Sequence, residues 1–188
     1  TSSKVIAEQF VHGENYRFLV LGDKVIAVAR RKSAHVIGDG KSNIKQLIEQ
    51  TNTIRKNSLL KPILVDNEVN LKLQRDGRSF DTIPQEGEQV ILRYNCNLTT
   101  GGTTEECMSE VCDYYKEQAI KAVKVTDAEF GGVDIIAQNI SSPGEFAINE
   151  INYNPGLRLH YKVDKGNVTD VAVPIMQYIR DKYINLQK

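Results

Sequence analysis

Hydrophobic and polar positions alternate along the first thirty residues of the chain, which is the pattern of paired β-strands. We expect three strands, at residues 5–11, 16–21 and 24–30. Glycine and polar residues at 13–15 and 21–23 supply the turn chemistry between them. The chain therefore begins as strands joined by tight turns.

The next fifty residues follow a helical spacing instead. Ser42 is predicted as an N-cap, and apolar residues follow it at the spacing of an amphipathic helix that ends near Thr51. A second helix is expected over residues 67–75, closed by Gly77. Because strand-like segments flank both helices, we interpret residues 38–87 as a small helical insertion.

Strands and helices are mixed in the rest of the chain. The sheet is expected to resume at residues 89–93, and the longest helix to run over 109–124. Two further strands, at 132–137 and 146–151, precede a last helix over 168–183. This order predicts an α+β fold, with helices on one face of a sheet.

The charge balance excludes several classes of protein. The 188 residues include 24 Lys and Arg and 24 Asp and Glu, so no net field attracts nucleic acid or an anionic membrane. No apolar run approaches the roughly 20 residues that span a bilayer, and residues 1–3 do not open a signal peptide. Three cysteines without CxxC spacing are typical of free thiols in a reducing compartment. We therefore expect a cytoplasmic protein that binds neither nucleic acid nor membrane.

Two segments near the end of the chain carry oxygen ligands suited to a metal ion. Asp134 lies in a Gly-Val-Asp strand, and Glu150 and Asn152 belong to a Glu-x-Asn-x-x-Pro-Gly segment at 150–156. Side chains two apart in a strand share one face at about 7 Å, so the three converge if the strands are neighbours. Carboxylate and amide oxygens are hard ligands for magnesium. Either carboxylate alone is better explained as a solvent-facing residue, but the combination predicts a magnesium site.

Three separated motifs resemble one family of ligases. The 150–156 segment after a Gly-Val-Asp strand is similar to the metal-binding end of the ATP-grasp superfamily. Residues 97–102, Asn-Leu-Thr-Thr-Gly-Gly, resemble a loop of glutathione synthetase-like members. Residues 34–40, Ala-His-Val-Ile-Gly-Asp-Gly, resemble a segment of cyanophycin synthetase, and bifunctional glutamate–cysteine ligase/glutathione synthetases carry a similar domain. Several motifs in the right order are less expected by chance than one.

The resemblance implies a fold and a missing partner. It implies an ATP-grasp C-terminal subdomain over residues 1–188, a mostly antiparallel sheet with flanking helices and the insertion at 38–87. ATP-grasp enzymes clamp nucleotide between two subdomains, and the first, with its lysines and glycine-rich flap, has no counterpart before Glu8. We therefore expect this chain to be a fragment that is inactive without an N-terminal subdomain of the same polypeptide.

The resemblance also implies which residues meet ATP and two magnesium ions. Adenine is expected at the strand that contains Glu8, Phe10 and Val11. The ribose is expected at Asn15 or, if the contact is shifted, at Glu14. A surface ion pair is nearly as good an explanation for each arginine below. The remaining implied contacts are catalytic Arg93, Arg17 and Arg31 on the transferred phosphoryl group, Asn97, Gly101 and Gly102 on the phosphates, and Asp134, Glu150 and Asn152 on the metal ions.

The implied reaction joins a carboxylate to an amine. The carboxylate attacks the γ-phosphorus of ATP and the amine then attacks the acyl phosphate, so the protein positions groups and neutralises charge. The substrates would be amino acids or peptides, and a homo-oligomer is left open. A D-alanine–D-alanine or RimK-like peptide ligase is an alternative, against which residues 34–40 count. A non-catalytic nucleotide-binding module is another, favoured by Asn15 and by the changed residues after Gly102.

Overall fold

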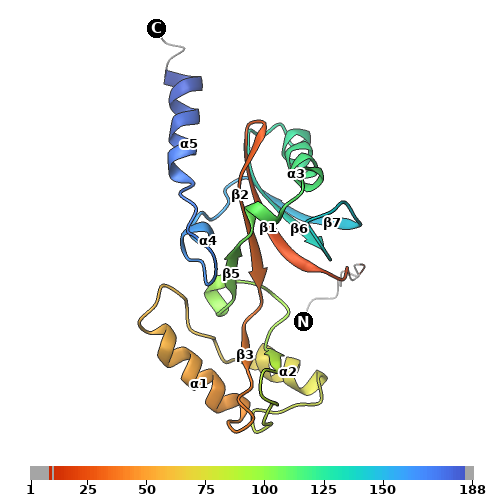
Figure 1. Ribbon diagram of the computed structural model, residues 1–188, viewed down its shortest axis with the longest axis vertical. Helices are drawn as coiled ribbons and strands as arrows, with labels where there is room; N and C mark the ends of the chain where they lie inside the picture. Colours follow the sequence, from red (N-terminus) through yellow and green to blue (C-terminus); the bar gives the residue numbers. More distant parts are fainter. Residues whose placement is uncertain (1–8, 10, 185–188) are drawn as a thin grey trace, which may run out of the picture.

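A five-stranded antiparallel sheet forms the centre of the protein, in a computed structural model that describes residue 9 and residues 11–184 (Figure 1). The strand order is β5-β2-β1-β6-β7. No helix in these described residues is long and apolar enough to cross a membrane. The predicted strand at 5–11 lies almost wholly outside them. The elements are β1 (Glu14–Leu21), β2 (Lys24–Lys32), β3 (His35–Ile37), α1 (Ile44–Arg55), α2 (Asn67–Arg75), β4 (Gln89–Ile91), η1 (Leu98–Thr100), β5 (Thr103–Glu106), η2 (Met108–Glu110), α3 (Asp113–Val125), β6 (Phe130–Ala137), β7 (Phe146–Asn152), α4 (Arg158–Tyr161), α5 (Ala172–Ile179) and a π-helical turn (Arg180–Ile184).

The β1–β2 hairpin supplies the middle of the sheet. A two-residue turn joins its strands, and Gly22 takes a positive φ of 59° there, which favours glycine. β6 pairs with β1 along its whole length, and β7 pairs with β6. The predicted strands at 16–21, 24–30, 132–137 and 146–151 are thus confirmed. They form the mostly antiparallel sheet that the resemblance implied.

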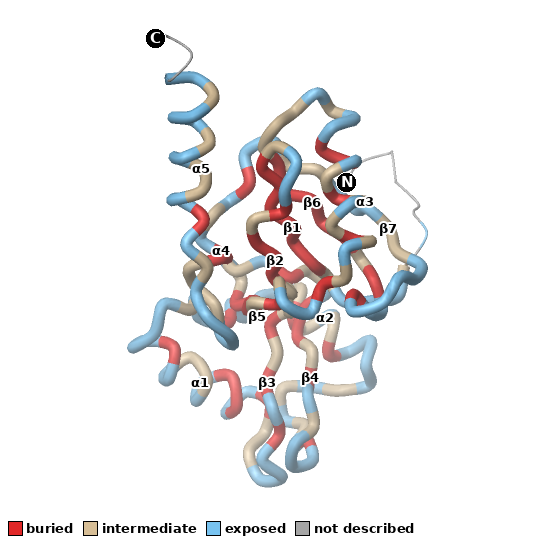
Figure 2. Tube along the Cα trace, turned by 45° about the horizontal axis from the view of Figure 1, so that its top comes forward, coloured by how far each residue is buried: buried red, intermediate tan, exposed pale blue. Residues whose placement is uncertain are grey.

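Both faces of the sheet are covered, so the prediction of helices on one face is wrong. On one face, Phe18 and Val20 pack with Tyr115 of α3 in the main hydrophobic core. On the other face, Leu19 and Ala27 pack with Val171, just before α5. Figure 2 shows the buried residues concentrated in these central strands. The second layer escaped prediction because only alternate residues of β1 and β2 form it, and they read as part of one apolar run.

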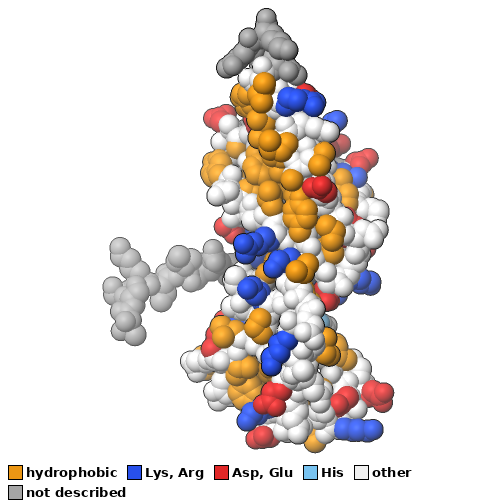
Figure 3. Space-filling view, turned by 90° about the vertical axis from the view of Figure 1, so that its left-hand side faces the viewer, with side chains coloured by type: hydrophobic (Ala, Val, Ile, Leu, Met, Phe, Trp, Pro, Cys, Tyr) orange, Lys and Arg blue, Asp and Glu red, His pale blue; other side chains and the backbone are white. Residues whose placement is uncertain are grey.

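The helix α5 is held on one side only. Ile175 packs against the smaller core, and the Tyr178 ring lies against Gly22. Val173 and Met176, on the other side, are 50% and 62% exposed. Figure 3 shows hydrophobic side chains gathered along this C-terminal helix and on the part of the molecule directly below it.

The two helices between residues 38 and 87, with the strands β3 and β4 on either side of them, form a second lobe with its own core. Ile44 and Leu47 of α1 pack with Val69 and Leu73 of α2, and with Val90 of β4. The sequence predicted that residues 89–93 rejoin the main sheet, which is wrong. β4 pairs with β3 in a separate two-stranded sheet, below the main one in Figure 1. Strand pairing over such a distance in sequence leaves no local signal.

Helix boundaries depend on which polar group caps them. α2 begins and ends where predicted, because Asp66 accepts N–H bonds at its start and Gly77, at a φ of 70°, follows its end. α3 begins at Asp113 rather than 109, because Cys112 is extended and donates its N–H to Ile140. α5 begins at Ala172 rather than 168, because its N–H donates to the Asp170 carboxylate.

The N-cap of α1 is Asn43, not Ser42. The Asn43 side chain accepts from the Gln46 N–H at 2.9 Å, and the Gln46 side chain accepts from the Asn43 N–H at 2.9 Å. This reciprocal pair is a capping box. Ser42 bonds to Asp39 instead, and the helix continues past Thr51 to Arg55.

Replacing the cap therefore tests the boundary. We expect Asn43→Ala to lower the free energy of unfolding by about 1 kcal/mol, because an N–H at the helix start loses its acceptor. Ser42→Ala is the matched control and should cost less. Urea denaturation of both variants measures the difference, and a larger loss in Ser42→Ala would contradict the assignment.

Candidate functional site

Strand register brings the predicted metal ligands together on one face of the sheet. Arg17 in β1 lies opposite Asp134 in β6, and Asp134 lies opposite Glu150 in β7. Asn152 lies opposite Gly132, two residues from Asp134 and therefore on the same face. Directly opposite residues have Cβ atoms about 4.5–5.5 Å apart. The two carboxylates and the amide thus form one compact group.

Asp134 is the most heavily engaged member of the group. Arg17 forms a bidentate pair with it, in which Nη2 donates to Oδ2 at 3.0 Å and Nε to Oδ1. Arg31 Nη1 donates to the same Oδ2 at 2.8 Å. The Asp134 and Arg17 side chains are each 9% exposed. Two guanidinium groups on one carboxylate leave a net positive charge beside the exposed Glu150.

Close packing fixes the position of Arg17. A Cβ atom on Gly132 would lie 2.7 Å from the Pro155 Cβ and 3.1 Å from the Arg17 Cδ. Only glycine leaves room for the arginine to cross β6, and the proline of the Pro-Gly segment covers it. The Nδ2 atom of Asn152, which lies opposite Gly132, is buried and has no hydrogen-bond partner in the part of the chain that the structure describes.

His160, from the short helix α4, completes the surroundings of Arg17. It is 2% exposed, and its Nε2 atom has no hydrogen-bond partner among the described residues. Burial, and secondarily the positive charge of Arg17, lower the pKa of His160 to about 4. His160 is therefore neutral at physiological pH and adds no second positive charge next to Arg17.

The glycine loop at 97–102 reaches the same group of charges. Arg31 Nη2 lies 3.4 Å from Asn97 Oδ1. Gly101 has a φ of 99°, and a Cβ atom there would lie 2.6 Å from the Cα of Ile63. Its N–H donates to Leu98, and the Gly102 N–H donates to Asn97. The glycines are thus required by the turn, and both N–H groups are occupied within it.

The nucleotide-binding residues predicted near the N-terminus lie in two different hollows. Asn15 and Arg31 line one hollow of about 240 Å³. Glu14, at the start of β1, lines this hollow too, and Asn15 shares the face of Arg17. Val11 lines a different hollow, with Tyr114 and Phe146. The predicted Glu8 and Phe10 lie outside the described residues.

Arg93 is not part of this group of charges. It is 1% exposed, forms ion pairs with Asp66 and Glu68, and donates to the Leu64 carbonyl at 3.0 Å. All of these partners belong to the helical insertion. The structure therefore brings together Arg17 and Arg31 but holds Arg93 inside the second lobe.

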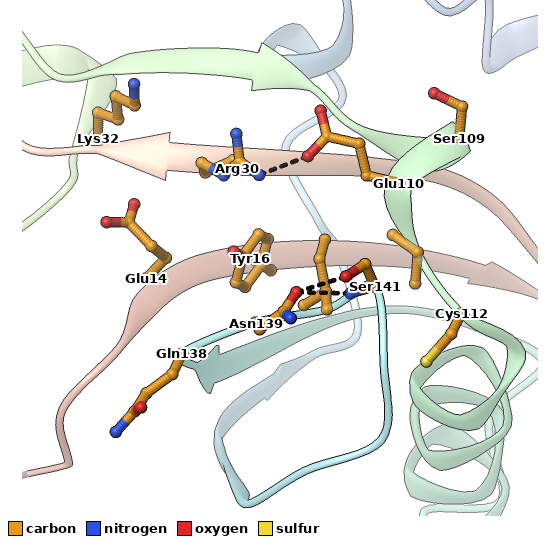
Figure 4. Close-up of a pocket in the computed structure, with 12 residues that line it drawn as sticks. Glu14, Tyr16, Arg30, Lys32, Ser109, Glu110, Cys112, Gln138, Asn139 and Ser141 are labelled. Carbon is orange, nitrogen blue, oxygen red and sulfur yellow. Dashed lines mark hydrogen bonds and ion pairs between the residues drawn. The ribbon is translucent and has the colours of Figure 1, made fainter.

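A further hollow, of about 750 Å³, lies on the α3 side of the sheet (Figure 4). Its two cations are compensated, because Arg30 pairs with Glu105 and Glu110 and Lys32 pairs with Glu105. Cys112 lines it, half-buried. The nearby Cys107 is buried, which raises the pKa of its thiol to about 12 and makes it a poor nucleophile.

Sequence reasoning missed one residue that contacts the glycine loop. Arg55 is buried at the end of α1 and donates to the carbonyl of Gly101. The available signal was its place on the buried stripe of α1, which Ile44, Leu47 and Ile48 otherwise form. A charged residue on an apolar stripe is unusual unless it has a partner.

Comparisons with known proteins identify the family. A family model described as a RimK-like ATP-grasp domain matches residues 21–179, so the chain belongs to the RimK-like ATP-grasp family. It is 41% identical over 183 residues to the glutathione biosynthesis bifunctional protein GshAB of Listeria innocua, covering 94% of this chain and 24% of that protein. It is 34% identical over 183 residues to the cyanophycin synthetase of Crocosphaera subtropica, covering 93% and 21%.

A solved structure agrees with the sequence relatives. The crystal structure of a bifunctional glutathione synthetase from Pasteurella multocida matches with a TM-score of 0.74 at 28% identity, covering 92% of this chain and 25% of that one. The ATP-grasp resemblance and the α+β fold are thus confirmed. The chain spans about a quarter of the length of these relatives.

The lowered pKa of His160 predicts a pH dependence of stability. The unfolded histidine takes up a proton near pH 6.5, but the folded one resists protonation until about pH 4. The contribution of the neutral His160 to the free energy of unfolding is therefore complete above pH 6.5. It is lost as the pH falls to 4, by roughly 3 kcal/mol. We expect the free energy of unfolding of His160→Gln, measured by urea denaturation, to fall less than that of the parent protein between pH 6.5 and pH 4. If the free energy of unfolding fell equally with pH in both proteins, the buried neutral state would be contradicted.

Proposed function

We propose that this chain is the magnesium- and nucleotide-binding half of an ATP-dependent carboxylate–amine ligase that works through an acyl phosphate. The observation that carries the proposal is the group of Asp134, Glu150 and Asn152 on one face of neighbouring strands, with Arg17 and Arg31 beside it. The relatives named for glutathione biosynthesis and cyanophycin synthesis support amino acid or peptide substrates. The chain spans about a quarter of the length of those relatives, and in the proposal the other half of the nucleotide cleft comes from a second subdomain.

The residues present fit magnesium. Two carboxylates and an amide provide the hard oxygen donors that the ion prefers. Asp134 and Glu150 lie directly opposite each other, so their carboxylates are close enough to share one ion. The amide of Asn152, on the same face, would complete the set of ligands. Bound there, magnesium would link the carboxylates to phosphate oxygens and neutralise their charge.

Arg17 and Arg31 supply the charge that a phosphoryl group requires. Each guanidinium already holds Asp134, and each has more N–H groups than that carboxylate can accept. Their fixed forks would orient the γ-phosphate and stabilise charge during transfer. Arg93 is not included in this role, because it is 1% exposed and its ion pairs with Asp66 and Glu68 hold it in the second lobe.

The remaining predicted contacts complete the nucleotide site. Asn15 would bond the ribose, since it lines the hollow that contains Arg31. Glu8, Phe10 and Val11 would meet the adenine. Asn97 is close to Arg31, and the loop with Gly101 and Gly102 would lie over the phosphates, as its link to Arg31 supports.

The charge of Glu150 provides the sharpest test in the intact ligase. We expect Glu150→Gln to reduce magnesium-dependent ADP formation by at least about 100-fold, the effect of removing one charge-stabilising group. Glu117→Gln changes an exposed carboxylate of α3, away from the site, and is the matched control. Near-normal activity in Glu150→Gln would refute the metal assignment.

The isolated chain tests binding separately from turnover. We expect magnesium with ATP to raise the melting temperature of residues 1–188, because a ligand bound only by the folded state stabilises it. Asp134→Asn should abolish the increase, measured against the same variant without ligand. No ADP should form, and robust ligase activity of residues 1–188 alone would contradict the proposal that a second subdomain is needed.

A further inference from the structure

Arg55 is a buried cation without an ion pair to a carboxylate in the described part of the chain. It is 8% exposed, at the last residue of α1. Its Nη1 donates to the carbonyls of Lys61 and Gly101, both at 2.8 Å. Burial lowers the pKa of Arg55, an effect that the more distant Asp164 carboxylate opposes. Two neutral carbonyls are modest compensation for a buried charge, so stability alone does not explain an arginine here.

Gly101 joins the two lobes of the protein. The insertion meets the glycine loop not only through Arg55 but also through its segment at 61–64. The N–H of Leu64 donates to the Thr100 carbonyl at 3.4 Å, and Ile63 lies so close to Gly101 that no Cβ atom would fit. Asn52 of α1 fixes Ile63 in turn, bonding both its N–H and its carbonyl.

The glycine loop connects Gly101 to the charged residues of the candidate metal site. Within the turn, the N–H of Gly102 donates to the Asn97 carbonyl at 2.9 Å. The Asn97 side chain faces Arg31, and Arg31 bonds Asp134. A continuous series of polar contacts therefore runs from α1 to the candidate metal carboxylate. Moving Gly101 by a fraction of an ångström would displace Asn97, which contacts the guanidinium group of Arg31.

We propose that Arg55 is a positioning residue, through which the helical insertion sets the glycine loop against Arg31. This inference rests on the proposed ligase function and adds to it a role for the insertion. Arg55 itself touches neither nucleotide nor metal. It acts through the Gly101 carbonyl, so its loss should weaken use of ATP while the protein stays folded.

Kinetics of the intact ligase test this role. We expect Arg55→Met to lower kcat/KM for magnesium-ATP by about 10–100-fold, the effect typical of residues that orient those contacting a ligand. Arg55→Lys keeps a donor and should recover part of the loss. Lys56→Met, at the exposed neighbouring position, is the matched control and should match the parent enzyme. An Arg55→Met enzyme that melts lower but keeps the parental KM and kcat would show a purely structural role and overturn the proposal.

A double-mutant cycle keeps the proposal testable if Arg55→Met fails to fold. If Arg55 acts through Asn97, Arg55→Lys combined with Asn97→Ala should lose little more than the larger single loss in kcat/KM. Losses that multiply independently would overturn the proposal. The Glu150→Gln enzyme separates the two claims, because full activity there refutes the ligase site whatever Arg55 does.

Discussion

The Asp134 carboxylate, held between the guanidinium groups of Arg17 and Arg31, is the interaction on which the site depends. Burying three charges is unfavourable unless they are paired, so the arrangement requires a rigid support. The antiparallel register of β1, β6 and β7 provides it, by aligning Arg17, Asp134 and Glu150 across adjacent strands. Gly132 leaves room for the arginine, and the core under α3 fixes the strands. The excess positive charge beside Glu150 suits a metal-bound polyphosphate better than an empty protein surface.

The second lobe meets this sheet at the glycine loop. The glycine loop contacts Arg55 and Ile63 of the insertion on one side and Arg31 of β2 on the other. The insertion has its own hydrophobic core and a buried Arg93 that pairs with Asp66 and Glu68. The insertion can therefore act as a rigid support for the glycine loop. The position of the loop relative to Arg31 then depends on how the two lobes pack together.

Much of this was readable from sequence, for physical reasons that also explain the failures. The apolar runs of β1 and β2, bounded by turn residues, and the caps of α2 are local signals, and those elements were predicted well. Ser42 and Asn43 are both good caps, so only the bond to Gln46 decides between them. The pairing of β4 with β3 and the burial of Arg93 depend on residues distant in sequence. Asp134 and Glu150 were predicted by motif and Arg17 and Arg31 by resemblance, but the pairing of both arginines with Asp134 follows only from the strand register.

The central claim is that a divalent ion binds where Asp134, Glu150 and Asn152 meet. The direct measurement is a crystal structure of the intact ligase with manganese and a non-hydrolysable ATP analogue, with anomalous scattering recorded at the manganese edge. We predict an anomalous peak within coordination distance of a carboxylate oxygen of Asp134 and of Glu150, with Arg17 or Arg31 contacting the terminal phosphate. An occupied nucleotide whose manganese peaks lie away from both carboxylates would contradict this account.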